Sequence, residues 1–401
     1  MVKVLRGNVA ALTASWIIFG IGSSITTPYY PLYIKALGGS DFHVALVISV
    51  RRVAEIPLII PGGYLADIIG RRKLIVTLTW AIAFMFFMYA LAPSWEALIL
   101  IGIIESLLLL YRPALHAILI DSLPPDVRAK GVLISTIMPN IPWLIFPPIG
   151  GWLADKYGIL GYRYAYIIAG IAGVAAAILR TKFLRETLPK HEKKESIAKI
   201  FINSYKNSIS MIKKSDRKIK YLILGSILIS GITVSTYTSY AVVFASEVLG
   251  ISRELWGWYN VLGTISSTIL SLLVLPFIDS APRRAVIVTS SAIYTSSIYL
   301  LTSGMGQTTV LLSVVLSTLA STLYHPAWQA YIGDIVKKEE RGRISAIISV
   351  ATVLGFSWAN LLMGHLYSAD PLLAFKMALI VGIIETLYWS LVIKEPKVRL
   401  N

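Results

Sequence analysis

The chain has 401 residues, of which 56% are hydrophobic and only 14% are charged. So apolar a composition excludes a soluble globular protein and predicts a chain that lies in a lipid bilayer. The net charge of +16 comes from basic segments between apolar runs, the positive-inside pattern of membrane proteins, so nucleic acid is not an expected partner. The lack of cysteine excludes disulfide bonds and thiolate metal sites.

Twelve apolar runs are long enough, or nearly so, to cross a bilayer as α-helices. The expected helices span residues 9–36, 42–65, 74–91, 94–120, 131–154, 162–181, 221–248, 255–278, 286–301, 309–334, 345–366 and 372–393. No small-residue cleavage site follows the first run, so we expect a helix that is retained. An even number of crossings places both termini on one side, which the basic segments identify as the cytoplasm. The predicted fold class is an all-α membrane protein with twelve transmembrane helices.

The segment between the second and third expected helices combines two glycines, one acid and three cations. Gly62 and Gly63 allow a neighbouring helix to approach closely. Asp67 and the basic run at 71–73 lie at the water interface, where they can pair and anchor the loop on the cytoplasmic side.

The same pattern returns about half a chain later. Residues 277–288 match residues 65–76 at an offset of 212 and keep the acid and both arginines. Tyr111-Arg112-Pro113-Ala114 matches Tyr324-His325-Pro326-Ala327 at an offset of 213. Two matches at nearly one offset predict two homologous halves of the same orientation, an arrangement known among secondary transporters.

A basic linker lies between the halves. Residues 180–220 contain 13 Lys and Arg against 4 Asp and Glu. This composition predicts an amphipathic segment along the cytoplasmic membrane surface and not a separate domain. We therefore expect an N-terminal six-helix bundle at 1–182, the linker at 183–218 and a C-terminal six-helix bundle at 219–401.

The run Gly63-Tyr64-Leu65-Ala66-Asp67-Ile68-Ile69-Gly70-Arg71-Arg72 resembles the signature loop between the second and third helices of the major facilitator superfamily. The resemblance extends over essentially the whole chain. It implies two pseudo-symmetric six-helix halves around a central cavity, and a secondary active transporter that moves a small molecule by alternating access. It also implies a gate latch, made here by Asp67, Arg71 and Asp121 against the start of the eleventh helix.

A second resemblance concerns the direction of transport. In the fifth expected helix, Pro147, Gly150 and Gly151 match the Gly-Pro-x-x-Gly-Gly signature of family antiporters, whereas Phe146 and Pro142 stand where glycines are expected. We therefore expect a drug/proton antiporter-like protein of the plasma membrane that performs proton-coupled efflux as a monomer. Its expected partners are a small-molecule substrate, protons and the lipid bilayer. The sequence has no phosphate-binding loop, catalytic triad or metal cluster, so neither enzyme activity nor a cofactor is expected.

Two alternatives stay open. Three arginines inside expected helices favour proton-coupled uptake of a small organic anion or metabolite. They are Arg51, Arg52 and Arg112, against two carboxylates, Glu55 and Glu105. A non-transporting membrane sensor would need a soluble output domain, which neither the termini nor the linker is long enough to supply.

Charged side chains at bilayer depth cost about 3 kcal/mol or more, so each requires an explanation. Arg51 lies about 15 Å from the outer end of its expected helix. In a continuous helix, Arg51 and Arg52 are spaced to pair with Glu55. These residues form either a structural ion pair or a cavity-facing site for anion binding or coupling.

Glu105, Arg112 and His116 are spaced to share one stripe of the fourth expected helix. His325 and Gln329 occupy positions of the tenth helix that match Arg112 and His116. This polar set either faces the central cavity that the resemblance implies or forms hydrogen bonds between helices of one half.

Carboxyl and imidazole groups at bilayer depth can titrate near neutral pH. The proton-coupling candidates are Glu55, Glu105, His116 and His325. Among the aromatic residues, Tyr237 and Trp328 are candidates for substrate contact, although core packing is the commoner role of such residues. Glu385 and Lys376 of the last helix are expected to be peripheral.

Overall fold

The computed structural model describes residues 5–59, 68–124, 127–188, 202, 205–206, 208, 210–212, 215–274, 277, 281–337 and 340–395. All regular secondary structure in these residues is helical, and ten of their helices are long and apolar enough to cross a membrane. The predicted all-α class is therefore confirmed. The two other expected crossings, at 42–65 and 131–154, are divided into shorter helices.

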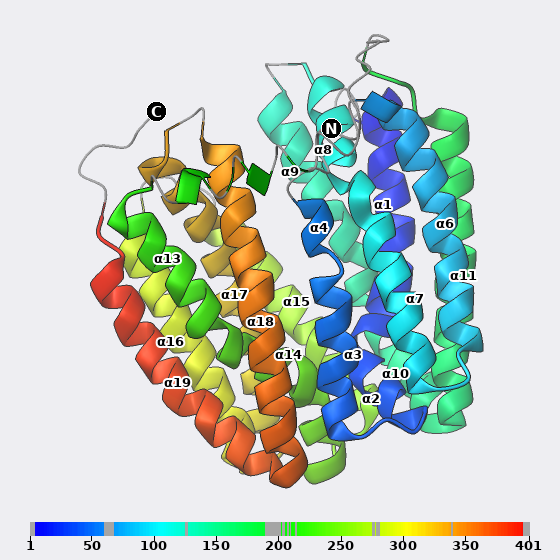
Figure 1. The fold of residues 1–401 in the computed structure, drawn as a ribbon. Coiled ribbons are helices and arrows are strands. Elements are labelled where there is room, and N and C mark those ends of the chain that lie inside the picture. The colour runs from blue at the N-terminus through cyan, green and yellow to red at the C-terminus, as the bar shows by residue number, and fades with distance from the viewer. Residues whose placement is uncertain are drawn as a thin grey trace. The chain divides into compact units, whose positions relative to one another are not determined.

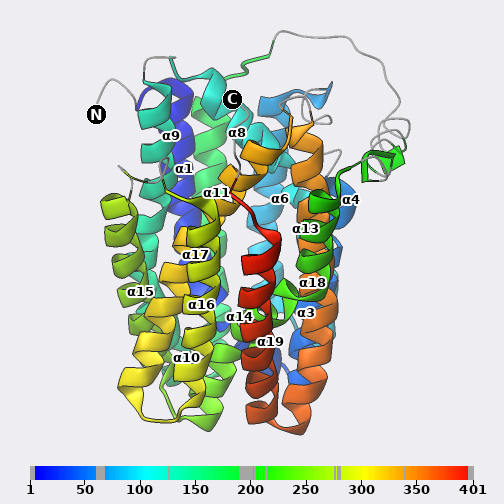
Figure 2. The same ribbon diagram turned by 90° about the vertical axis from the view of Figure 1, so that its left-hand side faces the viewer.

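The chain packs as two compact units, called here unit 1 (Met1–Gly38 and Ala54–Tyr205) and unit 2 (Gly39–Val53 and Lys206–Asn401). Unit 1 contains α1 (Gly7–Thr26), the 3-10 turn η1 (Thr27–Tyr29), α2 (Tyr30–Ala36), α4 (Ile56–Ile59), α6 (Arg71–Leu91), α7 (Trp95–Leu108), the 3-10 turn η2 (Leu109–Tyr111), α8 (Arg112–Asp121), α9 (Arg128–Ile137), the 3-10 helix η3 (Met138–Leu144), α10 (Phe146–Tyr157) and α11 (Ile159–Phe183). Unit 2 contains α3 (Asp41–Val53), α13 (Arg217–Leu228), α14 (Ser230–Val243), the π-helical turn η4 (Phe244–Val248), α15 (Arg253–Val274), α16 (Arg283–Thr302), α17 (Gln307–Ile335), α18 (Arg341–Ala369) and α19 (Pro371–Val392). Figures 1 and 2 show that the long helices within each unit run side by side.

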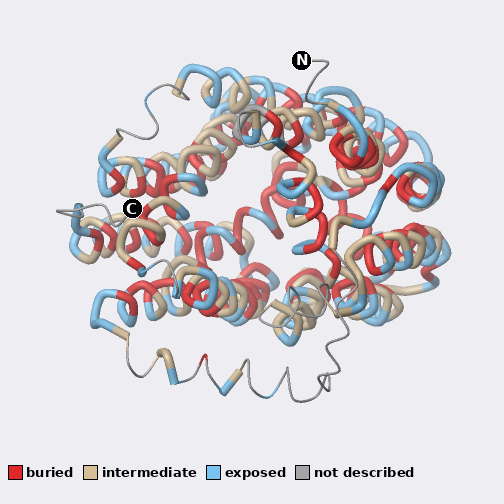
Figure 3. The backbone as a smooth tube through the Cα atoms, turned by 90° about the horizontal axis from the view of Figure 1, so that it is seen from above, coloured by how far each residue is buried: buried red, intermediate tan, exposed pale blue. Residues whose placement is uncertain are grey.

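In unit 1, α11 packs against both α1 and α6. Small residues allow this close approach: a Cβ added to Gly22 would lie 3.0 Å from the Cβ of Ala169, and one added to Gly173 would lie 3.0 Å from the Cβ of Ala83. Lipid supplies no hydrophobic drive between helices, so close van der Waals contact has to hold them together. Buried positions therefore lie on helix sides that face neighbouring helices of the unit (Figure 3). Side chains on the opposite sides stay exposed, such as Ile171 at 61%.

In unit 2, α16 packs against α17 and α19, and α18 packs against α13, α14 and α3. The crossing of α14 and α18 depends on paired glycines, because a Cβ added to Gly231 would lie 2.1 Å from the carbonyl oxygen of Gly355. No larger residue fits there without moving the backbone.

The helix expected at 131–154 is not continuous, and that prediction was wrong. α9 ends at Ile137, the 3-10 helix η3 follows, and α10 begins at Phe146. Pro139 and Pro142 lie in the interrupted stretch. Proline has no N–H to donate and its ring clashes with the preceding turn, so the α-helical ladder cannot run through both positions.

The helix α3 precedes α4 in the sequence but packs in unit 2, against α18. The Asn360 amide nitrogen donates to the carbonyl oxygen of Ala45 at 3.0 Å and to the Ser49 hydroxyl at 3.1 Å. The Ser49 hydroxyl in turn donates to the carbonyl oxygen of Ser357 at 3.1 Å. The packing boundary thus falls at Val53, inside the second expected crossing. This boundary describes packing only. The homologous halves expected at 1–182 and 219–401 rest on the sequence repeat and stay a prediction.

A substitution at Gly364 tests how closely α3 and α18 are packed. A Cβ at this position would lie 2.5 Å from the Cβ of Ala45 and 2.7 Å from the hydroxyl oxygen of Tyr240. We expect Gly364→Ala to lower the free energy of unfolding by about 1–3 kcal/mol, because the added methyl overpacks the contact. Thermal unfolding of the purified protein measures this. Gly333→Ala is the matched control, since a Cβ on Gly333 meets nothing within 4 Å. Equal melting temperatures for the two variants would contradict the prediction.

Candidate transport site

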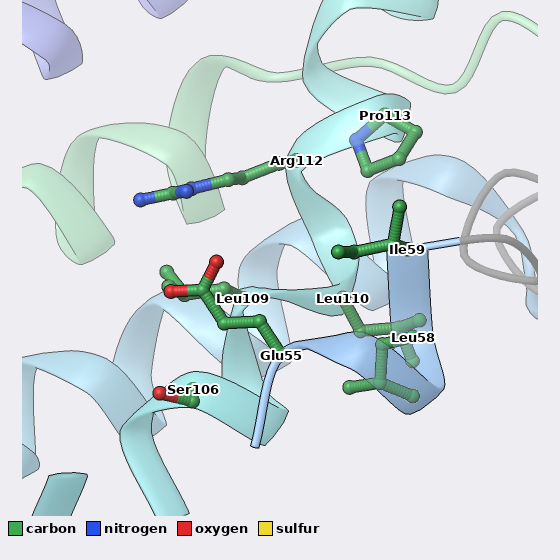
Figure 4. Close-up of a pocket in the computed structure, with 8 residues that line it drawn as sticks. All are labelled: Glu55, Leu58, Ile59, Ser106, Leu109, Leu110, Arg112 and Pro113. Carbon is green, nitrogen blue, oxygen red and sulfur yellow. The ribbon is translucent and has the colours of Figure 1, made fainter. Parts of the chain in front are cut away.

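A cavity of about 160 Å³ lies in unit 1 beside the break in the second expected helix. The residues that line it (Figure 4) are Glu55, Leu58, Ile59, Ser106, Leu109, Leu110, Arg112 and Pro113. Most are apolar, and the two charged side chains have opposite signs. Sites that enclose a whole drug-sized ligand usually have roughly 300–1,000 Å³. This cavity is smaller, so it suits one polar group of a substrate.

A helix break places Glu55 at the cavity. α3 ends at Val53, Glu55 lies in a turn, and α4 begins at Ile56. Pro57 explains the interruption, because it has no N–H to bond to the carbonyl of Val53, its α-helical partner four residues earlier. Instead the N–H of Leu58 donates to the carbonyl oxygen of Glu55 at 3.0 Å.

Arg51 and Arg52 lie on α3, on the other side of this break. The Arg52 guanidinium lies 4.8 Å from the ring centroid of Phe356 in unit 2. The predicted pairing of Glu55 with these arginines depended on one continuous helix. Since α3 ends at Val53, the i,i+3 and i,i+4 helical spacing does not apply.

Arg112 reaches the cavity from the second irregularity of unit 1. The 3-10 turn η2 separates α7 from α8, and Arg112 is the first residue of α8. Figure 4 shows the Glu55 carboxylate and the Arg112 guanidinium projecting to the same side of the cavity. Within the described part of the chain, neither side chain forms an ion pair or a side-chain hydrogen bond. The cavity thus holds one carboxylate, which can bind a proton, and one permanently charged guanidinium, which can bind an anionic group.

Glu105 does not line this cavity. It is buried, with 7% of its surface exposed, and its Oε2 accepts a hydrogen bond from the Tyr89 hydroxyl at 2.7 Å. Tyr89 stacks on Tyr166, with ring centroids 5.0 Å apart. The predicted stripe of Glu105 with Arg112 assumed one unbroken helix, and the 3-10 turn between them changes the direction of the later side chains.

The other expected cavity residues are not among those that line this cavity. His116 is exposed, with its ring centroid 6.2 Å from that of Trp16 on α1. In unit 2, His325 and Gln329 of α17 are also exposed. Trp328, in contrast, is buried and stacks on Tyr324 with ring centroids 5.6 Å apart.

Tyr237 is buried within unit 2. Its hydroxyl lies 3.0 Å from the Ser313 hydroxyl, and its ring packs edge-on against Tyr294 at 5.7 Å. These contacts give Tyr237 a packing role in the described structure. Its part in substrate contact stays a prediction.

Two of the three expected gate residues lie in the described part of the chain. The Arg71 Nη1 lies 2.6 Å from Oδ2 of Asp121, and the repeat-related Arg283 Nε lies 3.2 Å from Oδ2 of Asp334. Each ion pair joins two helices of one unit. Asp67, the third expected latch residue, lies outside the described residues, as does its counterpart Asp279. The role of this set as a gate therefore stays a prediction.

Two acids that sequence reasoning missed cap the same helices. Glu186 Oε2 accepts from the backbone N–H of Arg72 at 2.9 Å, and the Glu395 carboxylate accepts from the N–H groups of Arg283 and Arg284 at 3.0 Å each. A helix N-terminus has free N–H groups and a positive potential, so a carboxylate is stabilised there. The two acids are 209 residues apart, close to the repeat offset, and that spacing could have identified them.

Arg180 was also missed as a buried residue, because its charge was counted with the basic linker. It belongs to α11, and only 1% of its surface is exposed. Its Nε donates to the Ser15 hydroxyl at 2.9 Å and its Nη1 to the Thr79 hydroxyl at 2.8 Å. The rings of Phe19 and Tyr111 lie 5.3 and 5.7 Å from its Cζ. Its burial could have been suspected from the sequence, because Arg180 falls inside the expected helix at 162–181.

Glu385 is not peripheral, so that expectation was wrong. It is 7% exposed and lies between α19 and α14, where the Thr233 hydroxyl donates to its Oε2 at 2.7 Å. No group of three or more His, Asp or Glu side chains that could hold a metal ion occurs in the described ranges.

Comparisons with known proteins agree with this architecture. The family model of the Major Facilitator Superfamily matches residues 12–252 and 222–401. The Quinolone resistance protein NorA of Staphylococcus aureus is 25% identical over 244 residues, which cover 59% of this chain and 59% of NorA. The alignment thus spans less than two thirds of that relative. The uncharacterized MFS-type transporter MJ1317 of Methanocaldococcus jannaschii is 22% identical over 397 residues, which cover 96% of this chain and 94% of that protein.

Solved structures share the fold. The nucleoside transporter NupG has a TM-score of 0.75 at 12% identity, over 96% of this chain and 100% of that chain. A bacterial homolog of the human lysosomal transporter Spinster has a TM-score of 0.72 at 15% identity, over 96% of each chain. The predicted all-α transporter fold agrees with these structures, and the count of twelve helices stays a prediction.

The contacts of Arg180 give a prediction about stability. We expect Arg180→Met to lower the free energy of unfolding by about 3 kcal/mol, because it removes two charge-assisted hydrogen bonds and two cation–π contacts. Thermal unfolding of the purified protein checks the size of the loss. Lys182→Met is the control, since Lys182 is exposed on the same helix. If Arg180→Met unfolds within about 0.5 kcal/mol of Lys182→Met, the buried arginine is not a significant source of stability.

Proposed function

Since the chain belongs to the Major Facilitator Superfamily, we propose that it exports a small molecule across the membrane in exchange for protons. Transport by a multi-pass membrane protein follows from the family; the direction and the proton coupling are the proposal. The observation that carries it is the cavity where Glu55 and Arg112 lie together at a helix break. Glu55 is the proposed proton-binding group and Arg112 the proposed contact for an anionic substrate group.

The two charges make proton and substrate binding interdependent. A deprotonated Glu55 compensates the positive charge of Arg112, whereas a protonated Glu55 leaves that charge to an anionic group. Glu55 is half-buried and Arg112 is exposed, so their interaction is partly screened by water but still stronger than between two fully solvated charges. Binding at one group then changes affinity at the other by the same free energy in both directions.

Export rather than uptake is supported by two observations. NorA, the partial relative, is named for quinolone resistance. In α10, a Cβ added to Gly150 would lie 2.3 Å from the carbonyl oxygen of Ile25 on α1, so only glycine permits this approach. Gly150 is one of the residues that match the family antiporter signature, and its contact gives that match a physical reason.

The proposal also includes the location, oligomeric state and topology of the protein. We place it in the plasma membrane as a monomer, with both termini in the cytoplasm, because the basic segments mark the cytoplasmic side. Glu105, His116 and His325 remain additional proton-coupling candidates. Uptake of an organic anion is the competing function, and the excess of arginines over carboxylates in the second and fourth crossings favours it.

The pH-gradient experiment separates the two functions. In proteoliposomes, we expect an acidic lumen to drive accumulation of a quinolone, because protons that leave exchange for substrate that enters. An acidic exterior that drives accumulation would instead show symport and support uptake. We expect Glu55→Gln to abolish the driven component while preserving exchange at equilibrium, since glutamine cannot carry the proton. Uptake of the fluorescent quinolone norfloxacin into the lumen is the measurement.

Two further variants control this experiment. Glu105→Gln tests the buried carboxyl, and Glu96→Gln tests an acid in the first turn of α7 outside the cavity. We expect the Glu96 variant to transport like the wild type. Full gradient-driven transport by both Glu55→Gln and Glu105→Gln would mean that the carboxylates are structural and that the arginines form a site for an anionic substrate.

The gate makes a separate prediction. We expect Asp67→Asn to shift the population toward the inward-open state, because a charge contact made in only one state biases the equilibrium. Spin labels at Pro124→Cys and Lys337→Cys, which follow α8 and α17, report the distance between the cytoplasmic ends of the halves; the chain has no native cysteine. Longer distances are expected in the Asp67 variant and no change in Asp155→Asn. Identical distance distributions in all three proteins would remove the latch.

A further inference from the structure

Glu385 occupies an enclosed position in unit 2 that the proposed transport site does not use. Its Oε2 accepts from the Thr233 hydroxyl at 2.7 Å, and its Oε1 accepts from the Trp389 indole N–H at 3.3 Å. Trp389 is fully buried and packs edge-on against Trp328, with centroids 5.2 Å apart. Both donors are neutral, and the tryptophans shield the carboxyl from water.

No cation compensates this carboxyl within the described residues. Glu385 forms no ion pair with a lysine, arginine or histidine there. The groups that face it are the hydroxyls of Thr233 and Ser230 on α14, with Tyr294 of α16 and Tyr324 of α17 nearby. α13 and α18 also pack on α19, and among the described residues neither helix contributes an ion pair to Glu385. An ionised carboxylate held only by neutral donors loses its solvation by water without an opposite charge to compensate the loss.

The surrounding hydrogen bonds accommodate a neutral acid. The Thr233 hydroxyl lies 3.5 Å from the carbonyl oxygen of Ser230 as well as 2.7 Å from the Glu385 carboxyl. By rotating its proton toward Ser230, it can accept a hydrogen bond from a protonated Glu385. The other carboxyl oxygen keeps the donation from Trp389. A single hydroxyl rotation therefore satisfies both protonation states.

We propose that Glu385 is a proton-binding site of unit 2, with a neutral carboxyl when α14 and α19 are packed as in this structure. When the packing opens at Thr233 and water enters, the O–H bond breaks, the proton passes to that water and the carboxylate is solvated. The site is distinct from Glu55, which lies in unit 1. Exchange of this proton during each transport cycle rests on the proposed function; the neutral acid itself does not.

Infrared spectroscopy of the full-length purified protein tests the neutral acid without any substrate. A protonated carboxyl has a carbonyl stretch well separated from the bands of a carboxylate. We expect this band near neutral pH in the wild type and its loss in Glu385→Gln. Asp121→Asn, which removes an ion-paired carboxylate, is the control and retains the band. A wild-type spectrum with no band that disappears on Glu385→Gln overturns the proposal.

A second variant covers the case in which Glu385→Gln does not fold. Thr233→Val keeps the shape of the side chain but removes the hydroxyl, so the carbonyl stretch of a neutral Glu385 shifts in frequency. An unshifted spectrum in folded Thr233→Val contradicts a neutral carboxyl in contact with Thr233.

Proteoliposomes test the exchange of the proton. With an acidic lumen and norfloxacin as probe, we expect Glu385→Gln to lose gradient-driven accumulation and to retain equilibrium exchange. If the wild type shows no driven accumulation, the proposed function fails, and the infrared result still decides whether Glu385 is neutral. If the wild type and Glu385→Gln are driven equally, Glu385 does not exchange its proton during transport, and that part of the inference is overturned.

Discussion

A charged side chain inside the bilayer finds its hydrogen-bonding partners in the protein or not at all, and this requirement governs the interior of both units. Arg180 satisfies this requirement with two hydroxyl groups whose own protons are already engaged. Ser15 donates to the carbonyl oxygen of Leu12, and Thr79 donates to the carbonyl oxygen of Ile75. Each hydroxyl thus directs its lone pairs at the guanidinium. Arginine stays charged at any accessible pH, so this arrangement is permanent. A carboxyl in a similar place can instead lose its charge by binding a proton.

The buried arginine and the buried carboxyl lie at nearly corresponding positions of the sequence repeat. The acids that cap α6 and α16 are 209 residues apart, and the same offset relates Arg180 of α11 to Trp389 of α19. Glu385 lies four residues before Trp389, about one helical turn away. The helix ends at the two repeat-related positions keep the same ion pairs and caps, whereas the buried faces of α11 and α19 carry opposite ionisable groups. The two repeat-related regions therefore share their ion pairs and caps and differ in the charge of their buried faces.

Hydropathy predicted most of the helices, and the resemblance to the major facilitator superfamily implied the grouping of Arg71 with Asp121. They did not predict where a crossing breaks, because an apolar run has the same composition whether or not its helix is continuous. These breaks change which side chains reach the cavity. The 3-10 turn before Arg112 separates it from Glu105, which shared its stripe in an ideal helix. The burial of Arg180 depends on hydroxyls from α1 and α6, and contacts between helices distant in sequence cannot be read from the periodicity of one of them.

The break at Glu55 connects the site with the packing of the chain. Upstream of it, Asn360 and Ser357 hold α3 in unit 2 by backbone and hydroxyl hydrogen bonds. Downstream, α4 lines the cavity of unit 1. The turn between them has lost the α-helical bond that Pro57 cannot make, so its dihedral angles are less constrained than those of a continuous helix. Glu55 itself lies in this turn. In the proposed function, ligand or proton binding at Glu55 changes the conformation of this turn, and such a differential interaction is what coupling of binding to conformation requires.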